Sequence, residues 1–505
     1  MFGTFVDSSA ELTSFGRVRF AYTKWFVCVY VTIMLTAGSA LCFILPPFRA
    51  PDEGNHFLRS FTISQGQFFA QPRAAGPWAG GSAEIAYRDL FQISIRGILK
   101  PAEKLTLDEL VAMWSIRVNG QYTPVIFPNT APYFMTGYVP QAIGIGLAHA
   151  IFHRAILHVI AGRLANLIAF TAVIALAMSI FPPFIPALIA FSALPMVLHL
   201  TASVSQDATI YSFMALYSVL LLRLTIAPPL TEAKAPTSAR LCLFFILALL
   251  GITSLVLCLA KLPYLPIVIL MPLMAYLRSD RKMLLFALGI SAFVIASLGL
   301  DAVYIHSLGT SLDDHANPSE QLSYIFHNPT EFARVILRTF AAWGGEFARQ
   351  MIAYLGWIDL PVPPAIFPFF FTVIGFAMLA VVLAMTRVDR PLLKRPHAFI
   401  IILGAIVVFS LTTVIFVCAA QYLIATEPRS EVVHLIQGRY FYPPVFIGGL
   451  SIAAIGGLCP AVRRGLADFD AHYRLSEICA SLLLVVLVFS QFFVGCLYID
   501  RFYLP

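Results

Sequence analysis

The chain has 505 residues, of which 59% are hydrophobic and only 12% are charged, and its mean hydropathy is +0.83. Soluble domains carry about 25% charged residues, so this composition excludes a soluble protein and predicts an integral membrane protein. The net charge of +7 does not indicate a nucleic-acid partner, because membrane proteins retain Lys and Arg in their cytoplasmic loops.

Apolar runs along the chain predict membrane helices, since about 20 apolar residues are needed to cross a bilayer. We expect one membrane domain over residues 1–505, an all-α polytopic fold with about 11 to 13 transmembrane helices. The run 184–201 lies among several prolines, so we predict that one run here is re-entrant or forms a pair of half-helices. The predicted spans are 25–46, 131–152, 156–180, 184–201, 206–226, 241–261, 263–277, 284–305, 365–386, 398–424, 440–458 and 476–498.

Basic residues set the expected orientation of these spans. Arg17, Arg19 and Lys24 precede the first run and predict a cytoplasmic N-terminus with that run as a signal anchor. Four further basic clusters lie within 234–240, 278–282, 387–395 and 463–474, and we place them all in the cytoplasm. Three segments then fall on the extracytoplasmic side: the long loop 47–130, the loop 306–364 and the short loop 425–438.

The loop 47–130 has helical signals of its own. Thr106 and Glu109 have the spacing of a capping box, and apolar residues follow at helical intervals to residue 118. This pattern predicts an amphipathic helix lying on the membrane surface. Similar but weaker patterns predict surface helices at 84–98 and 319–350.

The stretch PDEGNHFLRS, residues 51–60, concentrates ionisable residues directly after the first apolar run. If a helix starts here, then Asp52, Glu53, His56 and Arg59 are spaced to share one of its faces. One interpretation is that the two acids only cap a surface helix, because acidic residues are favoured at a helix N-terminus. The other is that the four residues line a functional site.

Further polar residues stand at predicted membrane boundaries and each allows two interpretations. Asp207 is either a helix cap or a site residue, and Arg163 either pairs inside the helix bundle or belongs to a site. Lys261 and Arg439 either reach lipid phosphate or bind an anionic ligand. Trp357 and Asp359, in YLGWIDLPVPP, form either an interfacial anchor and turn or part of a site.

The predicted topology places most of these residues on the extracytoplasmic side. Acids together with separated cations at the outer leaflet are typical of a site that holds an anionic lipid head group and a hydroxylated acceptor. The residues in question are Asp52, Glu53, His56, Lys261, Asp359 and Arg439.

Several motifs carry a resemblance to a known family. PPFRAPDEGNHFLRS resembles the P-P-D-E-x-x-H-x-x-R signature of a bacterial family of predicted multi-spanning membrane proteins. SVSQDA is similar to that family's S-x-N-S-D motif, although Ser205 and Gln206 depart from it, and KLPY, GWIDLPVPP and IQGRYFYPP match its later motifs in order. A second departure is the FRA before Pro51.

This family in turn resembles the GT-C glycosyltransferases, which have a first span followed by a long outer loop with an acidic motif. That resemblance implies transfer of a sugar from a polyprenyl-phosphate donor to a cell-envelope glycan or lipid-linked acceptor, on the extracytoplasmic side of the bacterial cytoplasmic membrane. Nucleic acid is not an expected partner; the lipid bilayer is.

The resemblance also implies roles for the residues. Asp52 would be the general base, supported by Glu53. The donor phosphate and lipid would be bound by His56, Arg59, Lys261, Arg439 and Tyr440, and the substrate by Asp207, Tyr264, Trp357 and Asp359. No metal is required, but if a divalent ion takes part, Asp52 and Asp207 are its expected ligands.

The sequence is also compatible with two rival functions. A transporter or flippase of a lipid-linked glycan would also need broken helices and charges within the membrane, but nearer its midplane and with repeat symmetry. A non-catalytic assembly factor would use its outer loop to bind a partner.

Overall fold

The computed structural model describes residues 23–72, 78–99, 103–226, 237–308, 316–357, 359–360, 362–388 and 396–504. Arg17 and Arg19 lie outside these ranges. So do the parts of two predicted cytoplasmic clusters that fall within 227–236 and 389–395. Among the described residues, nine helices are long and apolar enough to cross a membrane. They are α2 (Thr23–Ile44), α7 (Ala155–Ile180), α10 (Asp207–Ile226), α11 (Thr237–Ala260), α13 (Arg281–Leu308), α16 (Ile366–Met385), α17 (Pro396–Ala425), α18 (Tyr442–Leu458) and α20 (Leu475–Phe502).

The all-α polytopic fold is therefore confirmed, but the described residues contain nine or ten candidate spans where the sequence predicts 11 to 13. Two predicted spans do not form a single long helix. The run 131–152 gives the 3₁₀ turn η1 (Met135–Tyr138) and α6 (Val139–Ile151), a helix about 20 Å long. The run 263–277 gives the 3₁₀ helix η3 (Leu262–Ile269), which contains prolines, and only then α12 (Leu270–Leu277).

The predicted pair of half-helices is confirmed in the run 184–201. A short 3₁₀ turn, η2 (Pro182–Phe184), leads into α8 (Ile185–Ser192), and α9 (Pro195–Thr201) follows after a bend of 82°. Pro195 explains the break, because proline cannot donate the backbone hydrogen bond that would continue the helix. If the pair crosses the membrane as one broken span, it is the tenth candidate among the described residues.

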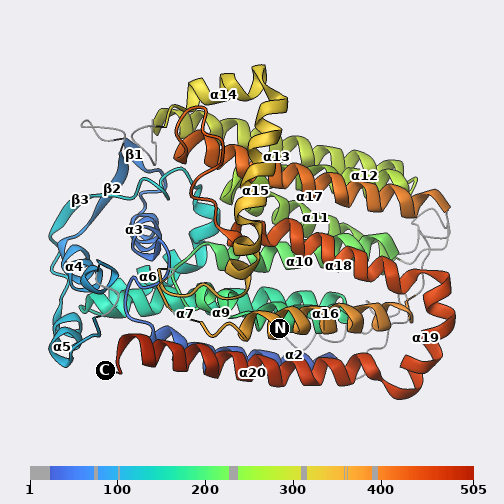
Figure 1. Cartoon of the computed structure of the whole chain (residues 1–505), viewed down its shortest axis with the longest axis horizontal. Helices are drawn as coiled ribbons and strands as arrows, with labels where there is room; N and C mark the ends of the chain where they lie inside the picture. The colour runs from blue at the N-terminus through green and yellow to red at the C-terminus, as the bar shows by residue number, and fades with distance from the viewer. Residues whose placement is uncertain are drawn as a thin grey trace.

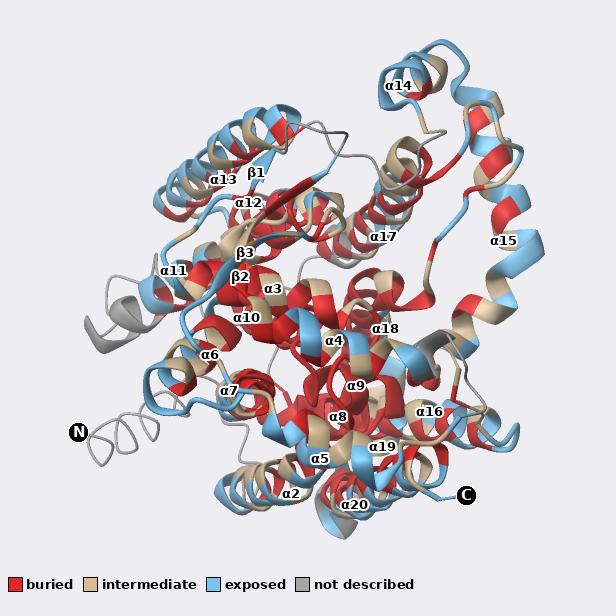
Figure 2. Cartoon of the chain, turned by 90° about the vertical axis from the view of Figure 1, so that its left-hand side faces the viewer, coloured by how far each residue is buried: buried red, intermediate tan, exposed pale blue. Residues whose placement is uncertain are grey.

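The centre of the bundle is formed by α10, α8, α9 and α18, which appear mostly red in Figure 2. In α10, 94% of the membrane-length window is buried, compared with 28% in α2 and in α13. A helix that is apolar on all sides belongs in the interior, and α10 packs there against α7, α11 and α18. Along one edge of the molecule α2 and α20 run side by side (Figure 1).

The described part of the region 47–130 contains three helices and a small sheet. The helices are α3 (Glu53–Ser64), α4 (Ile85–Leu99) and α5 (Leu107–Ser115), and the predicted capping box of Thr106 and Glu109 is confirmed at α5. The antiparallel sheet has the order β1 (Gln71–Pro72), β2 (Ala79–Glu84) and β3 (Tyr122–Ile126). It was not predicted because β2 has the sequence AGGSAE, without the branched residues typical of strands.

The remaining helices lie outside the central bundle. The stretch 319–350 forms two helices, α14 (Pro318–His327) and α15 (Pro329–Ile352), separated at Asn328 before a proline. A short 3₁₀ turn, η4 (Gly438–Phe441), packs on α15 and leads into α18, and α19 (Pro460–Tyr473) connects α18 to α20.

Candidate functional site

Four charged side chains meet at one end of the central bundle, and we call them the charged cluster: Asp52, Asp207, Lys261 and Arg439. Arg439 Nη2 donates to Asp52 Oδ2 at 2.7 Å, and its Nη1 lies 3.5 Å from Asp207 Oδ2. Lys261 Nζ donates to Asp207 Oδ1 at 2.6 Å. The cluster thus balances two acids with two cations, and distant parts of the sequence supply them.

Each member of the cluster occupies an end of a helix. Asp207 is the first residue of α10, where its charge is favoured by the helix dipole, and Lys261 follows directly after α11. Arg439 lies in η4, whose Gly438 approaches α15 so closely that an added Cβ would lie 2.1 Å from the Phe347 carbonyl oxygen. Only glycine permits this contact, and it positions Arg439 over Asp52 and Asp207.

Asp52 stands at the N-terminus of α3 in a left-handed conformation, with φ 60° and ψ 8°. Its carboxylate makes no capping hydrogen bond to that helix, so the interpretation of Asp52 as a simple cap is not supported. Instead, Oδ1 accepts a hydrogen bond from Asn129 Nδ2 at 3.0 Å, and Oδ2 accepts from Arg439. The side chain is 27% exposed, against 3% for Asp207 and Arg439 and 11% for Lys261, so Asp52 is the most accessible member of the cluster.

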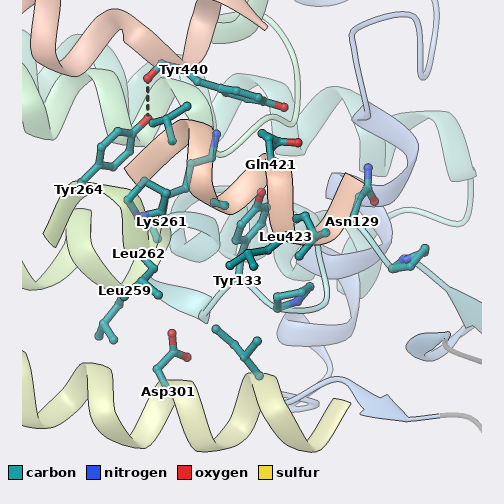
Figure 3. A pocket seen from close by; sticks show the side chains of 18 residues that line it. Asn129, Tyr133, Leu259, Lys261, Leu262, Tyr264, Asp301, Gln421, Leu423 and Tyr440 are labelled. Atoms are coloured by element: carbon teal, nitrogen blue, oxygen red, sulfur yellow. Dashed lines mark hydrogen bonds between the residues drawn. The ribbon is translucent and has the colours of Figure 1, made fainter. Parts of the chain in front are cut away.

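Aromatic side chains enclose the cations. The Tyr440 ring centroid lies 4.7 Å from Lys261 Nζ and 5.5 Å from Arg439 Cζ, and the Tyr133 ring lies 5.9 Å from Lys261 Nζ. Tyr264 donates its hydroxyl to the Tyr440 carbonyl at 3.4 Å (Figure 3). Burial lowers the pKa of Lys261 below its ordinary value, while the Asp207 carboxylate opposes that shift.

Glu53, the neighbour of Asp52, belongs to a different group of contacts. Both of its carboxylate oxygens accept hydrogen bonds from Arg163, Oε1 from Nε and Oε2 from Nη2, each at 2.8 Å. Oε1 also accepts from the Val204 amide at 3.0 Å. Glu53 and Arg163 are almost completely buried, so Arg163 pairs inside the bundle and Glu53 does not face the charged cluster.

His56 and Arg59 are buried as well, and the expected shared face of four side chains does not form. His56 Nδ1 lies 2.8 Å from the Tyr138 hydroxyl, and burial lowers the pKa of His56 to about 4. Arg59 donates to the carbonyls of Phe68 at 2.8 Å and Tyr133 at 3.2 Å. Arg59 therefore connects two loops. Helix spacing alone could not predict that His56 and Arg59 point in different directions.

Trp357 and Asp359 lie apart from the charged cluster. Trp357 Nε1 donates to the Phe48 carbonyl at 3.0 Å, and Asp359 Oδ1 accepts from the Trp357 amide at 2.7 Å. Asp359 Oδ2 accepts from Arg501 Nη2 at 2.5 Å. These two predicted substrate residues therefore belong to a second cluster with Arg501, at the end of α20.

An apolar groove of about 290 Å³ opens beside the charged cluster. Three of the predicted site residues line it: Lys261, Tyr264 and Tyr440. The rest of its wall is mainly aliphatic and comes from α11, η3, α13 and α17, with Asn129 and Tyr133 from the segment before η1 (Figure 3). An elongated apolar group could lie in the groove with a charged end at Lys261.

The candidate metal ligands Asp52 and Asp207 are arranged around a guanidinium instead. Arg439 lies between them and contacts both carboxylates. Within the described ranges, no group of three or more His, Cys, Asp or Glu side chains is placed to hold a metal ion. This donor set does not fit a divalent ion, and we derive no step through one.

Sequence reasoning did not find Asn129, Tyr133 or Tyr138, which hold Asp52, Lys261 and His56. Their segment reads FPNTAPYFMTGY, residues 127–138, and was assigned mainly to a predicted span. The two prolines and the polar Asn-Thr pair in it are the signal of a loop.

The fold and the site define a multi-pass helical membrane protein with a charged cluster and an apolar groove at one end of its bundle. A family model described as "Predicted membrane protein (DUF2142)" matches residues 35–447. The chain belongs to this family. No curated protein and no solved structure matches the chain.

Proposed function

We propose that the protein is a GT-C-type glycosyltransferase that moves a sugar from a polyprenyl-phosphate donor to a cell-envelope glycan or lipid-linked acceptor. The observation that carries this proposal is the apolar groove that ends at Lys261 and Tyr440, beside the charged cluster. A groove of this kind suits a lipid chain, and the cations at its end suit the phosphate attached to that chain. The distribution of basic clusters in the sequence supports a reaction on the extracytoplasmic side, and in this proposal the membrane is the bacterial cytoplasmic membrane.

Lys261 and Arg439 bind the donor phosphate in this proposal. As the glycosidic C–O bond breaks, its electron pair passes to the phosphate oxygen, and the two cations stabilise the developing charge. Tyr440 lies against both cations and holds them at the end of the groove. Burial strengthens this effect, because charges interact more strongly away from water.

Asp52 is the general base in this proposal. It takes the proton of the acceptor hydroxyl, whose oxygen attacks the anomeric carbon from the side opposite the phosphate, so the configuration inverts. Asp52 is the most accessible carboxylate of the cluster, as a base that meets an entering acceptor must be. Arg439 pairs with Asp52 in this structure, so a donor phosphate that engages Arg439 would free Asp52 for the acceptor.

The other predicted residues have supporting roles. Asp207 holds Lys261 and Arg439 in place, and Glu53 fixes the start of α3 through Arg163. His56, neutral beside Tyr138, and Arg59, which joins two loops, position the wall of the site.

The test is sugar transfer by purified protein in detergent or nanodiscs, supplied with a panel of polyprenyl-phosphate sugars and candidate acceptors. We expect Asp52→Asn to lower the transfer rate by about 10²- to 10⁴-fold, the usual contribution of a general base. Asp89→Asn is the matched control, since Asp89 is a half-exposed residue of α4 whose ion pair with Arg88 is also exposed. Equal rates for Asp52→Asn and wild type would remove Asp52 as the base.

Transport of a lipid-linked glycan remains the second candidate because of one observation, the 82° bend between α8 and α9. Broken helices of this kind build the binding sites of many transporters. Movement of a fluorescent lipid-linked glycan across proteoliposomes, with no transfer from any donor in the panel, would favour this function over catalysis.

A further inference from the structure

A second group of charged residues lies where α2 and α20 end. Arg49 follows α2 and is 3% exposed, and Arg501, near the C-terminus of α20, is 5% exposed. Both guanidinium groups lie against the Phe502 ring, with Cζ 5.6 Å and 5.1 Å from its centroid. Two buried cations thus share one aromatic side chain.

The acids around this pair do not balance it. Asp359 forms an ion pair with Arg501. The next carboxylate, Glu109, is paired with Arg96 at 3.0 Å and also caps α5. Among the described residues no carboxylate lies within ion-pair distance of Arg49, so its buried positive charge has no counter-ion in the described part of the chain. Such a charge costs several kcal/mol unless an anion compensates it.

The guanidinium of Arg49 has unused donors. Its Nε and Nη1 are enclosed and have no hydrogen-bond partner among the described residues, so Nη2 is the nitrogen through which the group can be approached. Buried polar groups are normally hydrogen-bonded, and an exception calls for a ligand or another explanation. A charged guanidinium nitrogen that can be approached is a suitable donor to a phosphate oxygen.

The surroundings of Arg49 and Arg501 indicate which kind of molecule carries the phosphate. Two candidate membrane spans, α2 and α20, end at this place, so the guanidinium groups stand at the depth of lipid head groups. The segment before α5 is joined to the end of α20, since the Leu105 amide donates to the Phe502 carbonyl at 2.9 Å. On α5, Leu107 and Val111 are well exposed, and in Figure 1 this helix lies beside the C-terminus. An amphipathic helix of this kind rests on a membrane surface.

We propose that Arg49 and Arg501 form a binding site for the phosphate of an anionic membrane lipid. The site is separate from the charged cluster and does not depend on the function proposed above. It lies three residues before Asp52, in a segment where Phe48 and Asp52 both have positive φ and where Trp357 binds the Phe48 carbonyl. A lipid bound here would therefore hold the segment that carries Asp52.

The test measures the thermal unfolding midpoint of the detergent-purified full chain, with and without short-chain phosphatidylglycerol. We expect this lipid to raise the midpoint of wild type by about 2 to 5 °C and to leave Arg49→Gln unchanged. Arg88→Gln is the matched control, because Arg88 is exposed and its only described ion pair is with Asp89; it should respond like wild type. Arg49→Lys keeps the charge but has no nitrogen at the position of Nη2, so it should show less than half of the rise.

Several outcomes would overturn the proposal. In lipid-free detergent, Arg49→Gln should unfold at or above the wild-type midpoint, because it removes a buried unpaired charge. A midpoint below wild type by the same amount with and without lipid would mean that Arg49 only packs against Phe502. An equal lipid response in wild type and Arg49→Gln would place the lipid elsewhere, and an equal response to inorganic phosphate would replace the lipid by free phosphate.

Discussion

Asp52 and Glu53 are adjacent carboxylates at the start of α3, yet they lie in opposite kinds of environment. Glu53 is enclosed, and a single arginine and two backbone amides use its oxygens. Asp52 is partly accessible, has a positive φ, and shares Arg439 with a second carboxylate. A buried ion pair whose hydrogen bonds are satisfied stabilises the fold. A partly exposed carboxylate that shares its arginine with a second acid is available for a ligand.

The position of the helix start explains the difference. Asp52 precedes the first turn of α3 and its left-handed backbone directs the side chain away from the helix axis, toward Asn129 and Arg439. Glu53 is the first helical residue and points into the bundle, toward α7. Two adjacent residues therefore have different roles: Glu53 forms a structural ion pair, and Asp52 belongs to the charged cluster.

Removing the Glu53 charge should have the largest effect on stability. Glu53→Gln leaves Arg163 buried without a counter-ion, and we expect the free energy of unfolding to fall by about 3 to 5 kcal/mol. Denaturant titration in detergent micelles measures this. The double variant Glu53→Leu with Arg163→Met should recover much of the loss, because it removes both charges, and a loss below about 1 kcal/mol in Glu53→Gln would contradict the structural role.

Acid should destabilise the protein through His56. Burial lowers the pKa of folded His56 to about 4, whereas an unfolded histidine has its ordinary value near 6.5. Between these two values the unfolded state binds the extra proton, so the contribution is complete above pH 6.5 and declines as the pH falls toward 4. The loss from this residue is up to about 3 kcal/mol.

A comparison with His56→Gln tests this pH effect. Asp52 and Asp207 favour protonation of His56, and Arg439 and Lys261 oppose it. The amide of glutamine can still bind Tyr138 but does not titrate, so the variant should lose less stability between pH 6.5 and 4 than wild type. Identical pH profiles would show that other groups govern the acid response.

Gly438→Ala should disturb the charged cluster without changing any charge. The added Cβ would lie 2.1 Å from the Phe347 carbonyl oxygen, so η4 must move away from α15 and take Arg439 with it. We expect a loss of about 1 to 3 kcal/mol in stability together with reduced activity. Gly449→Ala in α18 is the matched control, since its Cβ would meet nothing within 4 Å, and a matching loss there would show a general helix effect.

Hydropathy located the membrane helices because length and composition decide which segments can cross a bilayer. Among the described residues, α6 and the pair η3–α12 are apolar but do not form single helices of membrane length, because loop and proline geometry interrupts them. The sheet escaped prediction because Gly80 is required by close approach to Val125, a contact between segments far apart in the sequence.

Charges at membrane boundaries indicated Asp207, Lys261 and Arg439, which the structure brings together with Asp52. The sequence could not separate Asp52 from Glu53, nor assign Asp359 to Arg501, because partners more than a hundred residues away decide these directions. The sequence can indicate which charged residues lie at helix ends. The direction of each side chain, and therefore its partner, depends on the tertiary contacts.

Asp52→Asn should have the smallest effect on stability, and this contrast with Glu53→Gln is the sharpest test of the comparison. Asparagine tolerates a positive φ at least as well as aspartate, so the backbone is not disturbed. Arg439 keeps Asp207 as its counter-ion, and the lost charge is partly exposed, so we expect a change of about 1 kcal/mol or less. The same denaturant titration applies; a loss as large as that of Glu53→Gln would make Asp52 a structural residue like its neighbour.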